Sequence, residues 1–250
     1  MRFTIYPAID LRNGRVVRLQ YGDPNKQTVF SDDPAAMGRQ WIAAGAEWLH
    51  VVNLDGAFDE AGAANWAALP QLARLGAQVQ FGGGIRALVD VARALEAGAA
   101  RVILGTAAIE NPALVTEAIQ QFGADKIVVG IDARDGRVRT RGWLHDTAVT
   151  PAQLAQQMKD SGVQTIIYTD ISRDGVLTGV NAAATAQLAQ AAGLHVIASG
   201  GVAALDDITR CAALADQGVA GVITGRAIYD GRLDLAEAFR RLETGDWRLG

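Results

Sequence analysis

Two stretches of the chain, AIDLRNGRV at residues 8–16 and GIDARDGRV at residues 130–138, carry one pattern and decide the fold. Both read Ile-Asp-x-Arg-x-Gly-Arg-Val, and Asp10 and Asp132 hold the same place in it, 122 positions apart. Each aspartate follows a short run rich in β-branched residues, which predicts that it stands at the end of a strand. The repeat is far longer than the period of a solenoid and indicates two similar halves.

Two further pairs of motifs repeat at nearly the same distance. GGGI at residues 82–85 is matched by SGGV at residues 199–202, a shift of 117 positions. Gly105, which opens GTAAI, is matched by Gly225, which opens GRAI, a shift of 120 positions. Each of these glycine turns follows a predicted strand. Three paired motifs at one spacing therefore predict two half-barrels, at about residues 1–122 and 123–250, within one domain spanning residues 1–250.

Short β-type runs alternate with helical patterns along the whole chain, which indicates a parallel sheet. The strands are expected at residues 4–10, 48–54, 78–81, 101–104, 126–132, 164–169, 195–198 and 221–224. Eight βα units with right-handed crossovers predict a closed (β/α)8 TIM barrel. Three helices are expected to start where a capping residue precedes a proline, at Asp33, Asn111 and Thr150. Two connections, residues 11–31 and 133–149, are long and contain strand-like stretches.

The composition fits such a barrel and excludes several classes of function. Half of the 250 residues are hydrophobic and 6% are aromatic, which suits strands buried on both faces. The net charge of −4, without a basic patch, argues against nucleic-acid binding. One cysteine and three scattered histidines offer no disulfide and no metal site. The absence of an apolar leader or an apolar run of membrane-spanning length predicts a soluble cytoplasmic protein with no membrane partner.

The repeat has a consequence for function. In a barrel, the turns after strands 3 and 4 lie across the mouth from those after strands 7 and 8, and the two strand-end aspartates face each other. Glycine turns let backbone N–H groups approach an anion. Two such anion sites flanking two carboxylates suit a small substrate with a phosphate at each end.

The paired carboxylates have a chemical and a structural interpretation. Asp10 and Asp132 stand where barrel active sites form, and as a pair they could act as base and acid. Alternatively, each could simply pair with a nearby arginine such as Arg12 or Arg134. Their symmetric placement favours catalysis.

Several other polar residues leave two interpretations open. Thr169 ends a strand and could bind a reacting hydroxyl, whereas Asp174 precedes a glycine and is typical of a turn. Trp143, in the loop Arg141-Gly142-Trp143, could stack on a flat heterocycle or anchor the loop. His50 lies inside a predicted strand, as a core histidine would.

Motifs spread over nearly the whole chain occur in the order found in one enzyme family. They are PAIDL at residues 7–11, GGGIR at residues 82–86, Gly142-Trp143, Asp174-Gly175 and GRA at residues 225–227. Through them the chain resembles the barrel isomerases of histidine biosynthesis, the phosphoribosylformimino-aminoimidazole carboxamide ribotide isomerases. The resemblance implies an Amadori rearrangement of an aminoaldose to an aminoketose, with no metal or organic cofactor. It also implies a monomer.

The resemblance assigns roles to single residues. Asp10 would be the base that removes the C2′ proton, and Asp132 the acid that protonates the ring oxygen. Thr169 would support the reacting sugar, and Asp174 is an alternative acid. One phosphate would be bound by Gly83, Gly84 and Thr106, the other by Gly179, Gly200, Gly201, Gly225 and Arg226, and further contacts would come from Arg18, His50 and Trp143.

Three rival functions are considered. The sister cyclase that makes imidazole glycerol phosphate shares the symmetry and both aspartates, but it typically has Cys-Leu-Asp where this chain has Ala8-Ile9-Asp10. A dual-substrate isomerase that also accepts phosphoribosylanthranilate would share Arg141-Gly142-Trp143. A barrel that binds a phosphorylated metabolite without catalysis would not need both aspartates.

Overall fold

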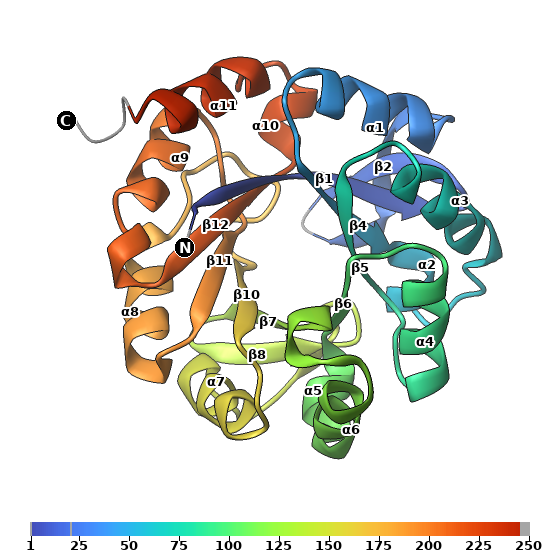
Figure 1. Cartoon of the computed structure of the whole chain (residues 1–250), viewed down its shortest axis with the longest axis vertical. Coiled ribbons are helices and arrows are strands. Elements are labelled where there is room, and N and C mark those ends of the chain that lie inside the picture. The colour runs from blue at the N-terminus through green and yellow to red at the C-terminus, as the bar shows by residue number, and fades with distance from the viewer. Residues whose placement is uncertain (1, 21, 246–250) are drawn as a thin grey trace.

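Eight parallel strands close into a barrel in the computed structural model, which describes residues 2–20 and 22–245 (Figure 1). In order around the barrel they are β1 (Thr4–Arg12), β4 (Trp48–Asn53), β5 (Gln78–Gly82), β6 (Arg101–Leu104), β7 (Ile127–Arg134), β10 (Thr165–Asp170), β11 (His195–Ser199) and β12 (Val219–Thr224). The last strand pairs with the first in parallel, with Thr4 opposite Gly221. The predicted TIM barrel is confirmed, and every strand lies within two residues of its predicted ends.

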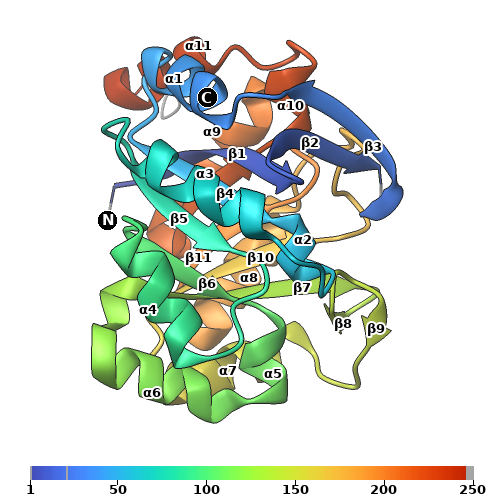
Figure 2. The ribbon, with the colours of Figure 1, turned by 90° about the vertical axis from the view of Figure 1, so that its right-hand side faces the viewer.

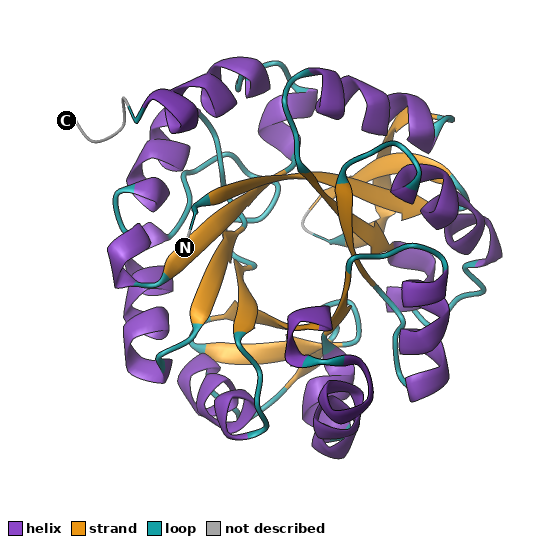
Figure 3. Cartoon of the chain, in the orientation of Figure 1, coloured by secondary structure: helices purple, strands orange, loops and turns teal. Residues whose placement is uncertain are grey.

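Helices form a ring outside the strands (Figure 3). The longer ones are α1 (Pro34–Ala43), α3 (Ala63–Ala73), α4 (Leu88–Glu96), α6 (Pro112–Phe122), α7 (Pro151–Asp160), α8 (Ala182–Ala192), α9 (Leu205–Ala212) and α11 (Leu235–Thr244). Short helical turns follow three of the strands: α2 (Leu54–Ala57), α5 (Thr106–Glu110) and α10 (Arg226–Tyr229). Two 3-10 turns, Ala124–Lys126 and Ala215–Gln217, complete the set in the described residues.

The three predicted helix starts are correct in position, and two of the three caps form. The Asp33 carboxylate accepts the Ala36 N–H at 3.0 Å, and the Thr150 hydroxyl accepts the Gln153 N–H at 3.3 Å. Asn111 makes no such bond, so the prediction of a side-chain cap there is wrong. The reason is local: Asn111 also ends α5, and its backbone (φ −144°, ψ 75°) serves the junction of two helices.

The barrel has two apolar layers. The larger core lies between strands and helices and contains side chains from both. A smaller cluster contains strand residues and fills the inside of the barrel, with Trp48 packed against it; its buried members are Tyr6, Ala8, Ile103, Val128, Ile167, Ile197 and Ile223. Because this inner cluster occupies the barrel interior, a ligand has room only beyond it, at the ends of the strands.

The two long connections fold into antiparallel excursions. After β1 come β2 (Arg15–Gln20) and β3 (Asp23–Ser31), and after β7 come β8 (Arg137–Thr140) and β9 (His145–Asp146). Figure 2 shows both excursions at the same end of the barrel. The strand-like stretches at residues 15–19 and 137–140 are thereby confirmed. The polar segment that forms β3 was not predicted as a strand.

Matched contacts relate the two halves of the chain. The Asp90 carboxylate accepts the N–H groups of residues 86 and 87 before α4, and the Asp207 carboxylate accepts those of residues 203 and 204 before α9. The two aspartates are 117 positions apart, as are the glycine turns that precede them. These contacts favour a division into half-barrels near residue 122, which stays a prediction.

Candidate active site

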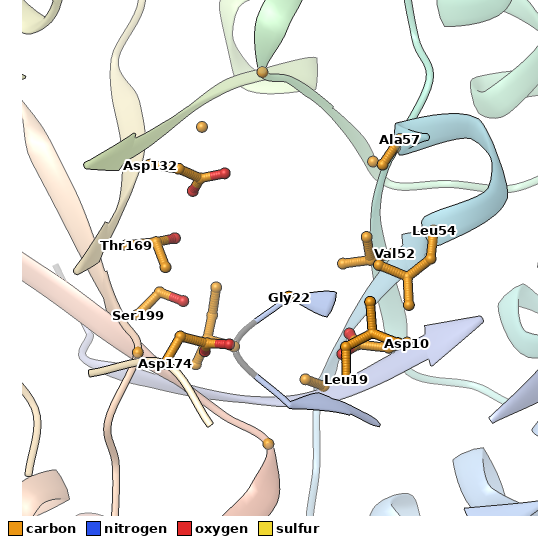
Figure 4. Close-up of a pocket in the computed structure, with 18 of the residues that line it drawn as sticks. Asp10, Leu19, Gly22, Val52, Leu54, Ala57, Asp132, Thr169, Asp174 and Ser199 are labelled. Atoms are coloured by element: carbon orange, nitrogen blue, oxygen red, sulfur yellow. The ribbon is translucent and has the colours of Figure 1, made fainter. Parts of the chain in front are cut away.

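A cavity of about 250 Å³ opens among the carboxyl ends of the strands (Figure 4). Of the fifteen predicted site residues, fourteen line it: Asp10, Arg18, His50, Gly83, Gly84, Thr106, Asp132, Trp143, Thr169, Asp174, Gly200, Gly201, Gly225 and Arg226. Gly179 does not line the cavity. Its N–H donates to the Gly201 carbonyl at 2.9 Å, so it supports the turn formed by Gly200 and Gly201 without lining the cavity itself.

Asp10 lies near the carboxyl end of β1 and forms an ion pair inside the cavity. The Arg18 Nη1 donates to its Oδ2 at 2.6 Å, and only 15% of the Asp10 side chain is exposed. Burial raises the pKa of Asp10, and the Arg18 guanidinium offsets part of that rise. The nearby arginine suggested by the sequence, Arg12, pairs with Glu60 instead. A buried carboxylate beside one cation remains available as a base.

Asp132 lies near the carboxyl end of β7, and its partners are neutral hydrogen-bond donors, not the Arg134 that the sequence offered. The Trp143 indole N–H donates to its Oδ2 at 2.8 Å, and the Thr169 hydroxyl also bonds to this carboxyl group. Burial raises the pKa of Asp132, and the negative charge of Asp174 raises it further, while both hydrogen bonds lower it. Asp132 therefore holds a proton more readily than a solvated aspartate does.

The sheet register places the two carboxylates in equivalent positions with different neighbours. Asp10 stands opposite Val52 of β4, and Asp132 stands opposite Thr169 of β10. Figure 4 shows Asp10 and Asp132 on opposite sides of the cavity. One carboxylate thus has an apolar neighbour in the adjacent strand and the other has a hydroxyl, which gives the two similar halves different chemistry.

Asp174 lies in the turn after β10, where Gly175 has a φ of +70°. The turn interpretation of this Asp-Gly pair is correct, and the side chain also lines the cavity. Its Oδ1 lies 4.0 Å from the Arg18 Nη2, so Arg18 stands between two carboxylates. The charge of Asp174 raises the pKa of both Asp10 and Asp132.

Two matched glycine turns form opposite parts of the cavity wall. Gly83 (φ +96°) and Gly200 (φ +88°) have left-handed backbones, and a Cβ on either would collide with the backbone of the preceding strand in the barrel. The next residue in each turn is equally confined: a Cβ on Gly201 would lie 2.5 Å from the Gly179 carbonyl. Only glycine fits this geometry. The turns bring bare backbone to the cavity, as anion binding requires.

The paired positions Thr106 and Arg226 hold neighbouring loops in place. The Thr106 hydroxyl accepts the Arg141 N–H at 2.9 Å. The Arg226 Nη1 donates to the Gly175 carbonyl at 2.6 Å, next to Asp174, while its Nε pairs with Asp230. The start of α5 is thus tied to the loop that carries Trp143, and the start of α10 to the turn that carries Asp174.

The loop after β8 turns Trp143 into the cavity. Arg141, Gly142 and Trp143 all have left-handed φ angles of 53°, 64° and 70°. Arg141 pairs with Glu110 at 2.8 Å, which fixes the start of this turn. A Cβ on Gly22 would lie 2.5 Å from the Trp143 ring, so the first excursion touches the second there. The indole therefore contacts Gly22 of the first excursion and the Asp132 carboxylate.

His50 of β4 lines the cavity, and its Nδ1 is 2.8 Å from the Gln80 Nε2. Sequence reasoning missed Gln80 and its neighbour Arg101; the available signal was a glutamine inside a short apolar strand. It also missed Arg86, which lines the cavity and donates to the Gly56 carbonyl at 3.1 Å.

Residues 2–20 and 22–245 hold no group of three or more His, Cys, Asp or Glu side chains placed to bind a metal ion. None of their helices combines the length and the apolar character needed to cross a membrane.

Comparison with known proteins gives the family. The family described as "Histidine biosynthesis protein" matches residues 4–234. The chain belongs to this family. The histidine biosynthesis match spans all eight barrel strands and therefore both carboxylates and all the glycine turns.

Individual members of the histidine biosynthesis family match the chain almost from end to end. A protein of Cereibacter sphaeroides is 53% identical over 239 residues, covering 95% of this chain and 98% of its own length. One of Roseobacter denitrificans is 52% identical, covering 96% and 99%. One of Geobacillus thermodenitrificans is 50% identical, covering 95% and 97%. Each of the three is named 1-(5-phosphoribosyl)-5-((5-phosphoribosylamino)methylideneamino)imidazole-4-carboxamide isomerase.

Proposed function

We propose that this chain is the aldose–ketose isomerase for which these relatives are named, acting in histidine biosynthesis. The observation that carries the proposal is the pair of buried carboxylates, Asp10 and Asp132, facing each other across one cavity between matched glycine turns. Relatives about half identical over nearly the full chain support the reaction. The substrate would be a small molecule with a phosphate at each end.

The reaction is an internal redistribution of protons and electrons. An acid protonates the ring oxygen of the aminoaldose, the C1′–oxygen bond breaks, and the nitrogen lone pair forms a C1′–nitrogen double bond. A base then removes the C2′ proton, and those electrons form a C1′–C2′ double bond while the nitrogen regains its lone pair. The resulting enol loses its hydroxyl proton, C1′ gains one, and a ketone remains. Substrate and product are isomers, so the balance requires no oxidant.

The electrostatics support Asp10 as the base and Asp132 as the acid. Arg18 at 2.6 Å favours the ionised form of Asp10. Among residues 2–20 and 22–245, the hydrogen-bond donors to Asp132 are neutral, and the charge of Asp174 raises its pKa. Neighbouring groups that separate the pKa values of two carboxyls assign their roles. Asp174 acts on both carboxyl groups through its charge, which supports Asp132 over Asp174 as the acid.

The two glycine turns would bind the phosphates. Gly83 and Gly84 would serve one end with Thr106, and Gly200 and Gly201 would serve the other with Gly225 and Arg226. Binding both ends would hold the reacting carbon between the carboxylates, and binding energy from these remote groups then supports catalysis. The resemblance to the family implies a monomer as the working unit. Light scattering on the purified protein tests that state.

The decisive experiment is a turnover assay on the formimino aminoaldose, followed by absorbance with a glutaminase–cyclase pair consuming the product. Asp10→Asn and Asp132→Asn are compared with Asp125→Asn, an aspartate whose side chain is 72% exposed. We expect each cavity variant to lose about 10²- to 10⁴-fold in kcat, as general acid–base catalysis contributes. The surface variant should match the unsubstituted enzyme.

The same assay separates the rival functions. Turnover of phosphoribosylanthranilate in parallel would extend the proposal to a dual-substrate enzyme. Conversion of the aminoketose to imidazole glycerol phosphate would identify the sister cyclase, which the names of the relatives do not favour. Binding of a bisphosphate analogue without any turnover would leave a metabolite-binding barrel and refute the isomerase.

A further inference from the structure

A chain of three polar side chains, Arg101, Gln80 and His50, leads to the cavity, with Gln80 fully buried and the other two half-buried. Its direction follows from donor and acceptor chemistry. Arg101 approaches the Gln80 Oε1 with its Nε at 2.9 Å and its Nη2 at 2.6 Å. A guanidinium has only donors, so the group facing it must be the amide oxygen. The amide of Gln80 is therefore oriented with its NH2 group pointing away from Arg101.

That NH2 group points at His50. The distance from the Gln80 Nε2 to the His50 Nδ1 is 2.8 Å. An amide NH2 only donates, so Nδ1 must accept and cannot carry a proton. The single proton of the neutral ring then lies on Nε2. Nε2 has no hydrogen-bond partner among residues 2–20 and 22–245, while the ring lines the cavity, so a free N–H donor is available there.

The charged surroundings keep this ring neutral. Burial, together with the positive charges of Arg101 and Arg18, lowers the pKa of His50 to about 3. Asp10, Asp132 and Asp174 line the same cavity. An imidazolium here would stabilise the ionised Asp10 further and weaken it as a base. A neutral N–H donor can bind a substrate oxygen without that effect.

Of these three side chains only His50 lines the cavity, and Arg101 is held in place by two aromatic rings. The Arg101 Cζ lies 4.4 Å from the centre of the Trp48 ring and 5.3 Å from that of Tyr6. Gln80 is fully buried. Substrate cannot reach Gln80 or Arg101, so either residue acts on it only through His50.

We propose that Arg101 and Gln80 are positioning residues that fix His50 as an uncharged donor, with Nε2–H directed at an oxygen atom of the bound sugar phosphate. The identity of that ligand rests on the proposed function, whereas the tautomer does not. In the register, His50 stands opposite Ala8, two residues deeper in the barrel than Asp10. The donor would thus contact the innermost part of the substrate.

The first test observes the ring directly. Proton–nitrogen NMR of protein labelled in its three histidines, with a His50→Asn spectrum for assignment, reports which ring nitrogen is protonated. We expect the Nε2–H form of His50 alone, unchanged over the range in which a free histidine titrates, around pH 6.5. An Nδ1–H form, a mixture, or titration in that range would overturn the proposal. This measurement needs neither substrate nor turnover.

The second test reverses the direction of the hydrogen bond between residue 80 and His50. In Gln80→Glu the carboxylate accepts a proton from Nδ1, which raises the pKa of His50 and moves the neutral form to Nδ1–H. The donor on Nε2 then exists only while the ring is doubly protonated. We expect kcat/KM of this variant to fall as the pH rises through the new pKa of His50, a limb absent from the unsubstituted enzyme. A merely structural role for Gln80 predicts uniform loss at every pH and would refute the proposal.

A third test measures how much the His50 donor contributes to substrate binding. Gln80→Met should raise KM about tenfold, the value of one ordinary hydrogen bond, with kcat little changed because the contact is made before and during reaction. The control is Gln71→Met, an exposed glutamine on α3. Thermal melting checks that each variant folds. If Gln80→Met does not fold, the NMR measurement on the unsubstituted protein tests the proposal. An unchanged KM in folded protein contradicts the inference, whereas absence of turnover in every form contradicts only the proposed function.

Discussion

Replacing Arg18 by glutamine should change the acid limb of the pH profile through Asp10. The two side chains meet at 2.6 Å, and about 13% and 15% of them are exposed, so solvent screens the pair little. A hydrogen bond between charged groups contributes roughly 1.5–3 kcal/mol. At 1.36 kcal/mol per pKa unit, losing it raises the pKa of Asp10 by about 1–2 units. Asp174 then acts on Asp10 without an opposing cation, which moves the pKa in the same direction.

The sign follows from the role of Asp10 as base. The base works ionised, so a higher pKa means that activity appears only at higher pH. The acid limb of kcat/KM, which reports the free enzyme, should move up by about 1–2 pH units in Arg18→Gln. Arg18→Lys keeps the charge and should recover much of the original limb. A limb that stays in place or moves down in Arg18→Gln, with the protein folded, would refute the assignment of Asp10.

Three further predictions concern other contacts. Trp143→Phe removes the indole donor from Asp132, so the pKa of Asp132 rises and the basic limb of kcat/KM should move up; an unmoved limb would exclude Asp132 as the acid. Gly200→Ala sets a Cβ 2.7 Å from a backbone oxygen at φ +88° and should lower the free energy of unfolding by more than about 1 kcal/mol in urea titrations; Gly136→Ala, where no atom lies within 4 Å, isolates the effect of the collision. Thr150→Ala removes a helix cap and should cost about 1 kcal/mol in the same titrations, with activity unchanged.

The strands of the barrel were predictable because their signal is local. The run at residues 126–132 consists mainly of apolar and β-branched residues, and this pattern is visible without knowledge of what packs against the strand. In both repeats the aspartate stands at the end of such a run. The segment of β3 has no such signal, since Asp23–Ser31 is mostly polar. It is a strand because it pairs with β2, a contact that no local pattern encodes.

The partners of the carboxylates were not predictable, for a related reason. Arg18 reaches Asp10 because β2 folds back along β1, and Trp143 reaches Asp132 because three successive left-handed residues turn its loop inward. The sequence instead suggested Arg12 and Arg134, each two positions beyond its aspartate, but Arg12 pairs with Glu60. Gln80 was missed because a single polar residue in a strand has the same pattern whether it is satisfied in the core or supports a site.

The matched glycine turns create a problem of orientation for a molecule with a phosphate at each end. Two nearly identical backbone turns would bind either phosphate equally well, yet the proposed reaction rearranges only one of the two riboses. The choice of direction falls to positions where the halves differ, such as Thr106 against Arg226 and His50 against Ile167, all of which line the cavity. A difference of about 1.4 kcal/mol between the two poses already makes nine in ten encounters productive. Substitutions that make these positions alike would leave the affinity for the substrate unchanged. More of the bound substrate would then lie in the reversed, unproductive orientation.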